Sequence, residues 1–473
     1  MTARATLDVQ GRFITYEEAV EDDFNVLSRL GYGAALQTLT NDLWRHRKSI
    51  EALTRHPLGL GKHDTCDVFE PRHWIRGGFN ICVMLTITSP GRQERKTVFR
   101  CAMPHKLAKA RYPGTVDEKL GCEVGAYVFL QENCPHVCIP HLYGFGFSDG
   151  RQPFLVRISR MFRRYIHRFF GRVPFVYLLL ERISPEYGQM LSNTWDKYRH
   201  DPVRRQRLFR GLSMIMLSLA RFPQMQIGSF QFNADGTLTL RNRPLTCSMM
   251  ILKNDGAPRT MQRSDKYRCT DAFVAGMALP RVFSHRFIQA EHRYGPFLLQ
   301  LTDLHASNIF VDDEWNVTCL IDLEWLCALP REMLGVPFWL TGCGIDQIQH
   351  DRYVEFDKIR HEFMHVLEDE ERVMAAEQGL GIIISSIMHE MWDSKGIWFW
   401  YCLSSVNAMY RLLEDHLCPG RLPVSVEKAV PQFWCEDPDA VVRTKVADKE
   451  HYDQLLRQAF EKMSRGDGGG VST

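Results

Sequence analysis

The spacing of apolar residues predicts helices at the start of the chain and strands from residue 74 onward. Within the first 70 residues, apolar side chains recur at roughly helical intervals, at Leu36, Leu39, Leu43, Ile50 and Leu53. From Trp74 the pattern changes to two apolar runs, FNICVMLTI and KTVFRCAM, which a Ser-Pro-Gly turn separates. Two such runs joined by a short turn predict a β-hairpin.

The next segment is predicted to contain one helix and two further strands. Apolar residues fall on one side of a helix over Asp117–Gln131, and the runs HLYGFGF and VPFVYLLLERI follow it. The second run is apolar without interruption, which favours a central strand of the sheet.

Beyond residue 183 the predicted elements are mainly helical. An apolar stripe over residues 204–222 is typical of a helix that packs on a core. Further helices are expected over Tyr353–Gln378 and Ile397–His416. Two hairpins interrupt them, IGSFQFNADGTLTLRNRP with an Asp-Gly turn, and NIFVDDEWNVTCLIDLEW.

Together these elements predict an α+β fold with a small β-rich lobe, a connection near Glu181–Pro185, and a larger helical lobe. The 473 residues are enough for two lobes that each bury a core. We expect a helical N-terminal extension (1–70), a β-rich N-lobe (71–183), a mainly helical C-lobe (184–445), and a C-terminal helix with a disordered tail (446–473).

Composition narrows the class of protein further. Hydrophobic residues make up 45% and charged residues 24% of the chain, as in ordinary soluble proteins. The net charge of +2 gives no overall attraction to nucleic acid, so none is expected as a partner. The 14 cysteines include no CxxC pair, no apolar run approaches a membrane span, and the opening residues lack the apolar core of a secretory leader. We therefore expect a cytoplasmic protein with reduced thiols.

The second hairpin carries polar residues that suit metal-dependent chemistry. Its antiparallel strands would bring Asn308, which enters the first strand, beside Asp322, which leaves the second. Asp303 lies five residues before Asn308. Amide and carboxylate oxygens suit Mg²⁺, and a second carboxylate can accept a proton from an attacking hydroxyl. Phosphoryl transfer has these needs. The alternative is a hairpin with polar caps, in which the aspartates only form turns.

The order D-x-x-x-x-N, a short hairpin and then I-D resembles the catalytic signature of the protein-kinase-like superfamily. The stretch TDLHASNIFVD…CLIDLEW is most similar to the aminoglycoside phosphotransferase family, and within it to a group common in fungi. This resemblance implies a two-lobed kinase-like fold that binds ATP and Mg²⁺ and phosphorylates a hydroxyl of a small molecule. It also implies that Asp303 is the catalytic base and that Asn308 and Asp322 bind Mg²⁺.

Blocks nearer the N-terminus extend the resemblance over residues 70 to 345. WIRGGFNICVML resembles the nucleotide-covering turn, where Gly77 and Gly78 would let the backbone approach phosphates. VFRCAMP resembles the strand that usually presents a phosphate-binding lysine, here replaced by Arg100, and Glu123 would hold Arg100 by an ion pair. LLLERI, with Glu181, resembles the segment where adenine docks. Read alone, the Arg100–Glu123 pair is also compatible with a surface salt bridge and the glycines with a plain hairpin entry.

Two departures from the family pattern leave catalysis open. Leu301 stands where a histidine usually precedes the catalytic aspartate, and Arg100 replaces the lysine. Neither removes the base or the metal ligands, but both are compatible with a weak enzyme or a catalytically silent binding module. The acceptor is not readable from the sequence, so antibiotics, sugars, choline-like compounds and secondary metabolites all remain open.

Two other patterns have competing interpretations. His361 and His365 form an HExxH string, which would suit a zinc hydrolase, but the charged flanks favour a solvated helix face. Residues 157–170 separate apolar from basic positions at helical spacing. They predict an amphipathic helix, which packs on the small lobe, contacts anionic lipid, or attracts an anionic substrate.

Overall fold

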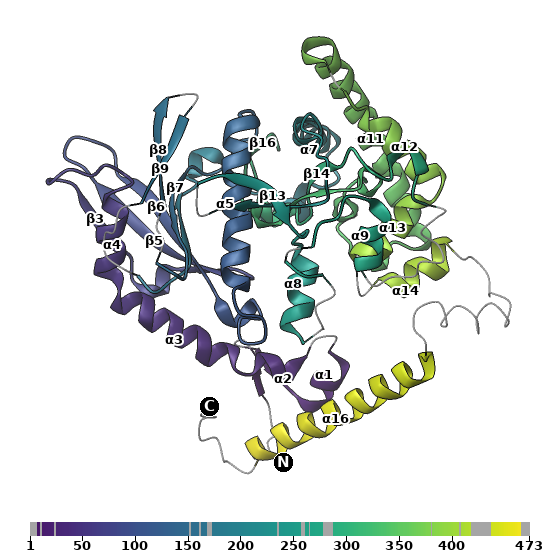
Figure 1. Cartoon of the computed structure of the whole chain (residues 1–473), viewed down its shortest axis with the longest axis horizontal. Helices are drawn as coiled ribbons and strands as arrows, with labels where there is room; N and C mark the ends of the chain where they lie inside the picture. Colours follow the sequence, from purple (N-terminus) through teal and green to yellow (C-terminus); the bar gives the residue numbers. More distant parts are fainter. Residues whose placement is uncertain are drawn as a thin grey trace.

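The computed structural model describes residues 7–9, 12–22, 25–150, 153–159, 162–167, 173–233, 236–256, 261–263, 265–277, 287–379, 381–405, 408–417 and 437–464. It is a two-lobed α+β fold (Figure 1).

The largest sheet forms the N-lobe. Its strands run in the order β3-β5-β6-β10-β7-β8-β9, with β4 also paired to β5. The strands are β3 (Thr65–Val68), β4 (Ile75–Arg76), β5 (Asn80–Thr88), β6 (Arg95–Ala102), β7 (Leu142–Gly146), β8 (Pro153–Ser159), β9 (Phe162–His167) and β10 (Tyr177–Glu181). The predicted hairpin is therefore β5–β6, and the run predicted as a central strand is β10, which pairs antiparallel with β6 and β7.

Helix α5 (Thr115–Asn133) lies between the N-lobe sheet and a second sheet, as Figure 1 shows. That sheet has the order β13-β12-β17-β14, formed by β12 (Gly228–Phe232), β13 (Leu238–Asn242), β14 (Leu298–Leu301) and β17 (Leu326–Leu329). Gly125 permits the close approach of α5, because a Cβ there would lie 2.7 Å from the Cβ of Phe230. Nearly every residue of α5 from Thr115 to Leu130 is buried, so this helix connects the cores of the two lobes.

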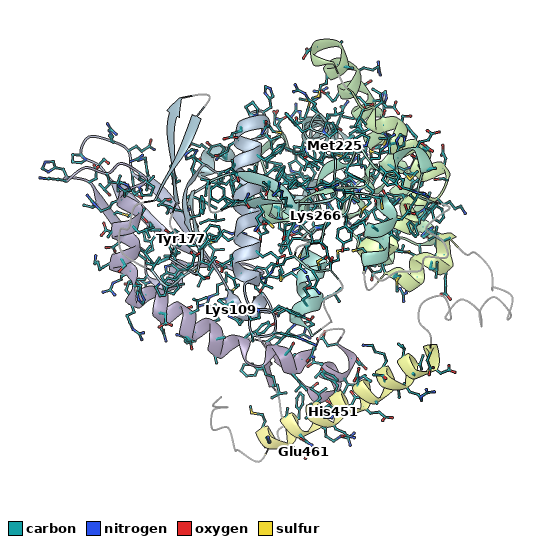
Figure 2. The ribbon with its side chains drawn as sticks, viewed as in Figure 1. Lys109, Tyr177, Met225, Lys266, His451 and Glu461 are labelled. Atoms are coloured by element: carbon teal, nitrogen blue, oxygen red, sulfur yellow. The ribbon has the colours of Figure 1, made fainter. Side chains whose placement is uncertain are left out.

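The C-lobe consists mainly of helices, together with a short sheet. That sheet has the order β11-β15-β16, from β11 (Gln189–Met190), β15 (Ile309–Val311) and β16 (Val317–Leu320). The helices are α6 (Trp195–Tyr198), α7 (Pro202–Ala220), α8 (Cys247–Asn254), α9 (Thr270–Gly276), α11 (His350–Gln378), α12 (Ile384–Asp393), α13 (Gly396–Ser404) and α14 (Met409–Leu412). Helix α7 begins where the Asp201 carboxylate accepts hydrogen bonds from two backbone N–H groups, with Pro202 in the first turn. Side chains fill the interior of both lobes, and Figure 2 labels Tyr177 in the sheet of the N-lobe.

The beginning and the end of the described chain pack together. The N-terminal part contains β1 (Leu7–Val9), β2 (Arg12–Ile14), α1 (Tyr16–Glu21), α2 (Val26–Arg29), α3 (Tyr32–Arg45) and α4 (Arg47–Arg55). Helix α16 (Pro438–Ser464) runs beneath α1 and α2 (Figure 1), and Leu456 and Phe460 share a small core with Leu7 and Val26. Helices α3 and α4 instead pack on the N-lobe sheet, through Leu43, Ile50 and Leu53.

The helix predicted over residues 157–170 is wrong. The described parts of this segment are the paired strands β8 and β9, with Phe154 opposite Ile166 and Val156 opposite Arg164. Phe, Val, Ile and Tyr all favour strands, and pairing of β8 with β7 overrides the helical spacing. The amphipathic-helix basis for membrane contact is therefore lost. No helix among the described residues is long and apolar enough to cross a bilayer.

The C-terminal predictions hold in part. The predicted helix over Tyr353–Gln378 is confirmed as α11. The one over Ile397–His416 is broken, because α13 ends at Ser404 and α14 starts at Met409. The disordered tail predicted over Ser464–Thr473 lies outside the described residues except for Ser464, which ends α16, and the four segment boundaries stay predictions.

Candidate active site

A cavity of about 640 Å³ lies between the two lobes, and it is called here the central cavity. Its walls come from the β4–β5 turn, β6, α2, α3, α8, the loop after β14 and the residues around β16. Asp303, Asn308 and Asp322 all line it, as do Gly77, Gly78 and Arg100. Six of the eight residues that sequence motifs single out therefore meet at one cavity.

The loop between β14 and β15 positions Asp303 and Asn308. The Asn308 Nδ2 donates to the backbone oxygen of Asp303 at 2.9 Å, which fixes the orientation of the amide. Because Nδ2 makes this bond, the Oδ1 atom is the one available to a cation. The backbone N–H of Ile321 donates to the backbone oxygen of Asn308 at 3.0 Å, so the hairpin places the residue before Asp322 beside Asn308.

Asp322 has an unusual backbone conformation. Its φ of 59° and ψ of 58° lie in the left-handed region, which few non-glycine residues adopt. Its Oδ1 accepts a hydrogen bond from the Arg100 Nη2 at 2.7 Å, while 40% of the side chain remains exposed. Strained conformations of this kind concentrate at functional sites.

Arg100 is held by three carboxylates. Glu123 and Glu324 accept from Nη1 and Nη2 respectively, the latter at 2.8 Å, in addition to Asp322. The guanidinium is buried, so the Arg100–Glu123 pair predicted from sequence forms in the interior rather than on the surface. Burial lowers the pKa of Arg100, but Asp322 and Glu324 outweigh this effect and raise it, so the side chain stays charged.

Three buried partners in this network, Lys119, Asn80 and Glu324, were not predicted from the sequence. The Lys119 ammonium lies 3.1 Å from Glu324, 3.2 Å from the second oxygen of Glu123 and 3.2 Å from the Asn80 amide oxygen. Asn80 in turn donates to Glu324. The available signals were weak: Lys119 is one helical turn before Glu123, and Glu324 follows Asp322 by two residues.

The charges of this region do not balance. Asp303, Asp322, Glu123 and Glu324 are four carboxylates, whereas Arg100 and Lys119 are two cations, so full ionisation leaves an excess of two negative charges. The imbalance is concentrated at Asp303, for which no cationic Lys or Arg partner appears among the described residues.

The pKa values of these carboxyl groups reflect the charge imbalance. Burial, with Glu324 and Asp322 adding repulsion, raises the pKa of Asp303 to about 7, against a weaker opposing hydrogen bond from the Cys247 thiol. Burial and Glu324 also raise the pKa of Asp322, although Arg100 opposes the shift. Burial would raise the pKa of Glu324 as well, but Arg100 and Lys119 hold it at about 2.

The donor set and its charge fit a magnesium ion. An amide oxygen of Asn308 and a carboxylate oxygen of Asp322 are hard ligands, and Mg²⁺ usually takes one or two carboxylates together with waters and phosphate oxygens. A divalent cation would also offset the two excess negative charges. Arg100 now contacts Asp322 Oδ1, so that oxygen would be shared or released when a cation binds.

The glycines and Glu181 differ in their relation to the cavity. Gly77 and Gly78 line it, and a Cβ on Gly78 would meet no atom within 4 Å, so the space beside this turn is open. Glu181 does not line it; its Oε2 accepts from the backbone N–H of His141 at 3.1 Å. This hydrogen bond orders the end of β10, and a role of Glu181 in adenine docking stays a prediction.

The HExxH residues lie on a solvated face of α11, as the charged flanks indicate. His361 and His365 are 65% and 76% exposed, and Glu362 pairs with Arg205. No group of three or more His, Cys, Asp or Glu side chains suited to a metal occurs among the described residues. The zinc-hydrolase alternative therefore lacks a third ligand in the part of the chain that is described.

Comparisons with known proteins yield structural similarity only. One similar structure is a thermostable mutant of the aminoglycoside phosphotransferase APH(4)-Ia, in a ternary complex with AMP-PNP and hygromycin B, at 12% identity over 77% of this chain and 98% of the other, with a TM-score of 0.33. A second is Plasmodium vivax ethanolamine kinase, at 11% identity over 88% of each chain, also with a TM-score of 0.33.

No family model matches the sequence, and a comparison with curated proteins gives no match. At such low identity and TM-score, the two structures do not assign a function to this chain.

Proposed function

We propose that this protein is an ATP- and Mg²⁺-dependent phosphotransferase that phosphorylates a hydroxyl group of a small molecule. The observation that carries the proposal is the convergence of Asp303, Asn308 and Asp322 on one cavity with an excess of negative charge. The aminoglycoside-phosphotransferase-like motifs at these positions support it independently.

Asp303 is the proposed catalytic base. Its carboxylate lines the central cavity, and its pKa of about 7 suits a group that must take a proton near neutral pH. An acceptor hydroxyl within hydrogen-bond distance would be oriented by this carboxylate and would give up its proton to it as the phosphoryl group arrives.

Asn308 and Asp322 are the proposed magnesium ligands. Bound Mg²⁺ would supply charge neutralisation for the nucleotide phosphates. Arg100 lines the cavity and would pair with phosphate oxygens through its fork of N–H groups. Glu123 and Glu324 hold that guanidinium in place, and the Lys119 ammonium pairs with both of these carboxylates.

A phosphotransfer assay over a broad panel of hydroxylated metabolites tests the proposal. Asp303→Asn should lower the rate by at least about 100-fold, since general-base catalysis contributes about 10²- to 10⁴-fold. Asp313→Asn is the matched control, because Asp313 is an exposed carboxylate in the neighbouring hairpin turn. Equal rates for Asp303→Asn and the wild-type protein would refute the role of the base.

A catalytically silent binding module is the second candidate. One observation favours it: Arg100 is engaged by Asp322, so the two residues expected to hold phosphate and metal are already paired. This candidate predicts that AMP-PNP with Mg²⁺ raises the melting temperature while no acceptor in the panel is phosphorylated. Turnover that depends on Asp303 would rule it out.

A further inference from the structure

Two neighbouring basic residues line the central cavity at positions far in sequence from the proposed magnesium ligands. They are Arg29 at the end of α2 and Lys106 in the turn after β6, whose charges act on each other, and they are called here the basic rim. The Asp255 carboxylate lies 3.6 Å from Arg29 and also lines the cavity. The rim therefore carries an excess of positive charge.

Lys106 is the less compensated member of the basic rim. No hydrogen bond or ion pair joins its ammonium group to another residue in the described part of the chain, although the side chain is only partly exposed. Burial and the neighbouring Arg29 both lower its pKa, as expected for a cation that lacks a counterion.

The basic rim is a built structure in which three parts of the chain meet. The side-chain oxygen of Asn254 accepts from the backbone N–H of Ala108 at 2.8 Å, and its nitrogen donates to the Tyr32 hydroxyl. Tyr32 also packs edge-on against His105, with ring centroids 5.3 Å apart. These contacts fix the end of α8, the start of α3 and the turn that carries Lys106 relative to one another.

Helix α8 runs from the proposed base to the basic rim, so its length gives the distance between them. Its first residue, Cys247, lines the cavity together with Asp303, its last residue, Asn254, lies at the rim, and Asp255 follows the helix directly. Eight residues of α-helix span about 12 Å at 1.5 Å per residue. A ligand of moderate size could therefore place a hydroxyl at Asp303 and reach the rim with its other end.

We propose that the acceptor carries a carboxylate or phosphate group that binds at the basic rim, about 12 Å from the hydroxyl that reacts at Asp303. The phosphorylation of such an acceptor rests on the proposed function, whereas the binding of an anion at the basic rim does not. The proposal predicts an anionic hydroxylated metabolite, and it argues against polycationic or quaternary-ammonium acceptors, which the rim would repel.

The terminal phosphate of the nucleotide is the other anion that could reach the basic rim. Inorganic phosphate is a probe that separates the two sources, when its affinity is measured by thermal shift at constant ionic strength with and without saturating AMP-PNP and Mg²⁺. We expect phosphate to bind with the nucleotide already in place. Lys106→Met should weaken phosphate binding about ten-fold, because a hydrogen bond to a charged group is lost.

Lys109→Met is the matched control, since it removes the same charge three residues away at an exposed position near the start of α5 (Figure 2). Asp255→Asn removes a negative charge from the basic rim and should therefore tighten phosphate binding a few-fold. Equal affinity in Lys106→Met and Lys109→Met would overturn the inference, as would displacement of phosphate by AMP-PNP or no binding to the wild-type protein. Asp303→Asn should bind phosphate normally, so a failure of the proposed catalysis would be seen separately.

Discussion

Replacement of Lys119 by methionine should destabilise the protein strongly, because it leaves two buried carboxylates with one cation between them. Lys119 is 1% exposed and lies within 3.2 Å of both Glu123 and Glu324. Removing one member of a buried ion pair typically costs about 3–5 kcal/mol. The pKa of Glu324 gives an independent scale: a value of about 2 against a usual 4.5 corresponds to about 3 kcal/mol of net stabilisation at pH 7, after the burial that raises this pKa is set against Arg100 and Lys119, which lower it.

The pH dependence of this loss has a definite sign. A carboxyl group with a lowered folded-state pKa stabilises the protein above its unfolded pKa, and this stabilisation is lost as the pH falls through the folded value. In Lys119→Met the pKa of Glu324 should rise, so protonation at pH 5 relieves part of the unpaired charge. The difference from wild type should therefore be smaller at pH 5 than at pH 8.

Urea unfolding followed by tryptophan fluorescence at both pH values measures this. Lys48→Met is the matched control, because Lys48 pairs with Glu51 at 2.7 Å on α4 but is 74% exposed, and such a pair contributes less than about 1 kcal/mol. Lys119→Met with Glu324→Gln should be less destabilised than Lys119→Met alone. If Lys119→Met costs no more than the Lys48 control at pH 8, the buried network does not stabilise the fold.

Three further predictions concern the site and the backbone that supports it. Asp303→Asn should be more stable than wild type at pH 8 but not at pH 4. The reason is that the raised folded-state pKa makes the ionised carboxylate destabilising as the pH rises through about 7. Thermal melts at both pH values would show no such crossover if Asp303 titrates normally. Mg²⁺ should raise the melting temperature of wild type but not of Asp322→Asn, and an equal rise in both would remove Asp322 from the metal site. Gly188→Ala should destabilise the protein by about 1–3 kcal/mol, since Gly188 has a φ of 89° and a Cβ would lie 2.0 Å from the Val311 oxygen; an unchanged urea midpoint would contradict this.

The parts of the site that the sequence predicts are those that local chain geometry brings together. Asp303, Asn308 and Asp322 fall within 20 residues, and one short hairpin is enough to place the last two side by side. The central position of β10 between β6 and β7 also follows from its uninterrupted apolar run. These features depend on neighbouring residues, which a sequence displays directly.

The parts that sequence reasoning missed depend on long-range packing. Asn80 and Glu324 are 244 residues apart, and Lys119 joins them only after α5 packs between the two sheets. Residues 157–170 were assigned to the wrong element because apolar positions there fit a helix locally, whereas pairing of β8 with β7 and β9 decides the outcome.

The small core beneath α1 and α2 connects both ends of the chain to the central cavity. Helix α2 is anchored there, as its Val26 backbone N–H donates to the Tyr452 hydroxyl at 3.1 Å, and three residues later the same helix supplies Arg29 to the basic rim. Loss of α16 would therefore release one wall of the cavity, although α16 contributes none of its lining residues. Expression designs that shorten the chain at residue 437 risk measuring a substrate preference that the intact protein does not have.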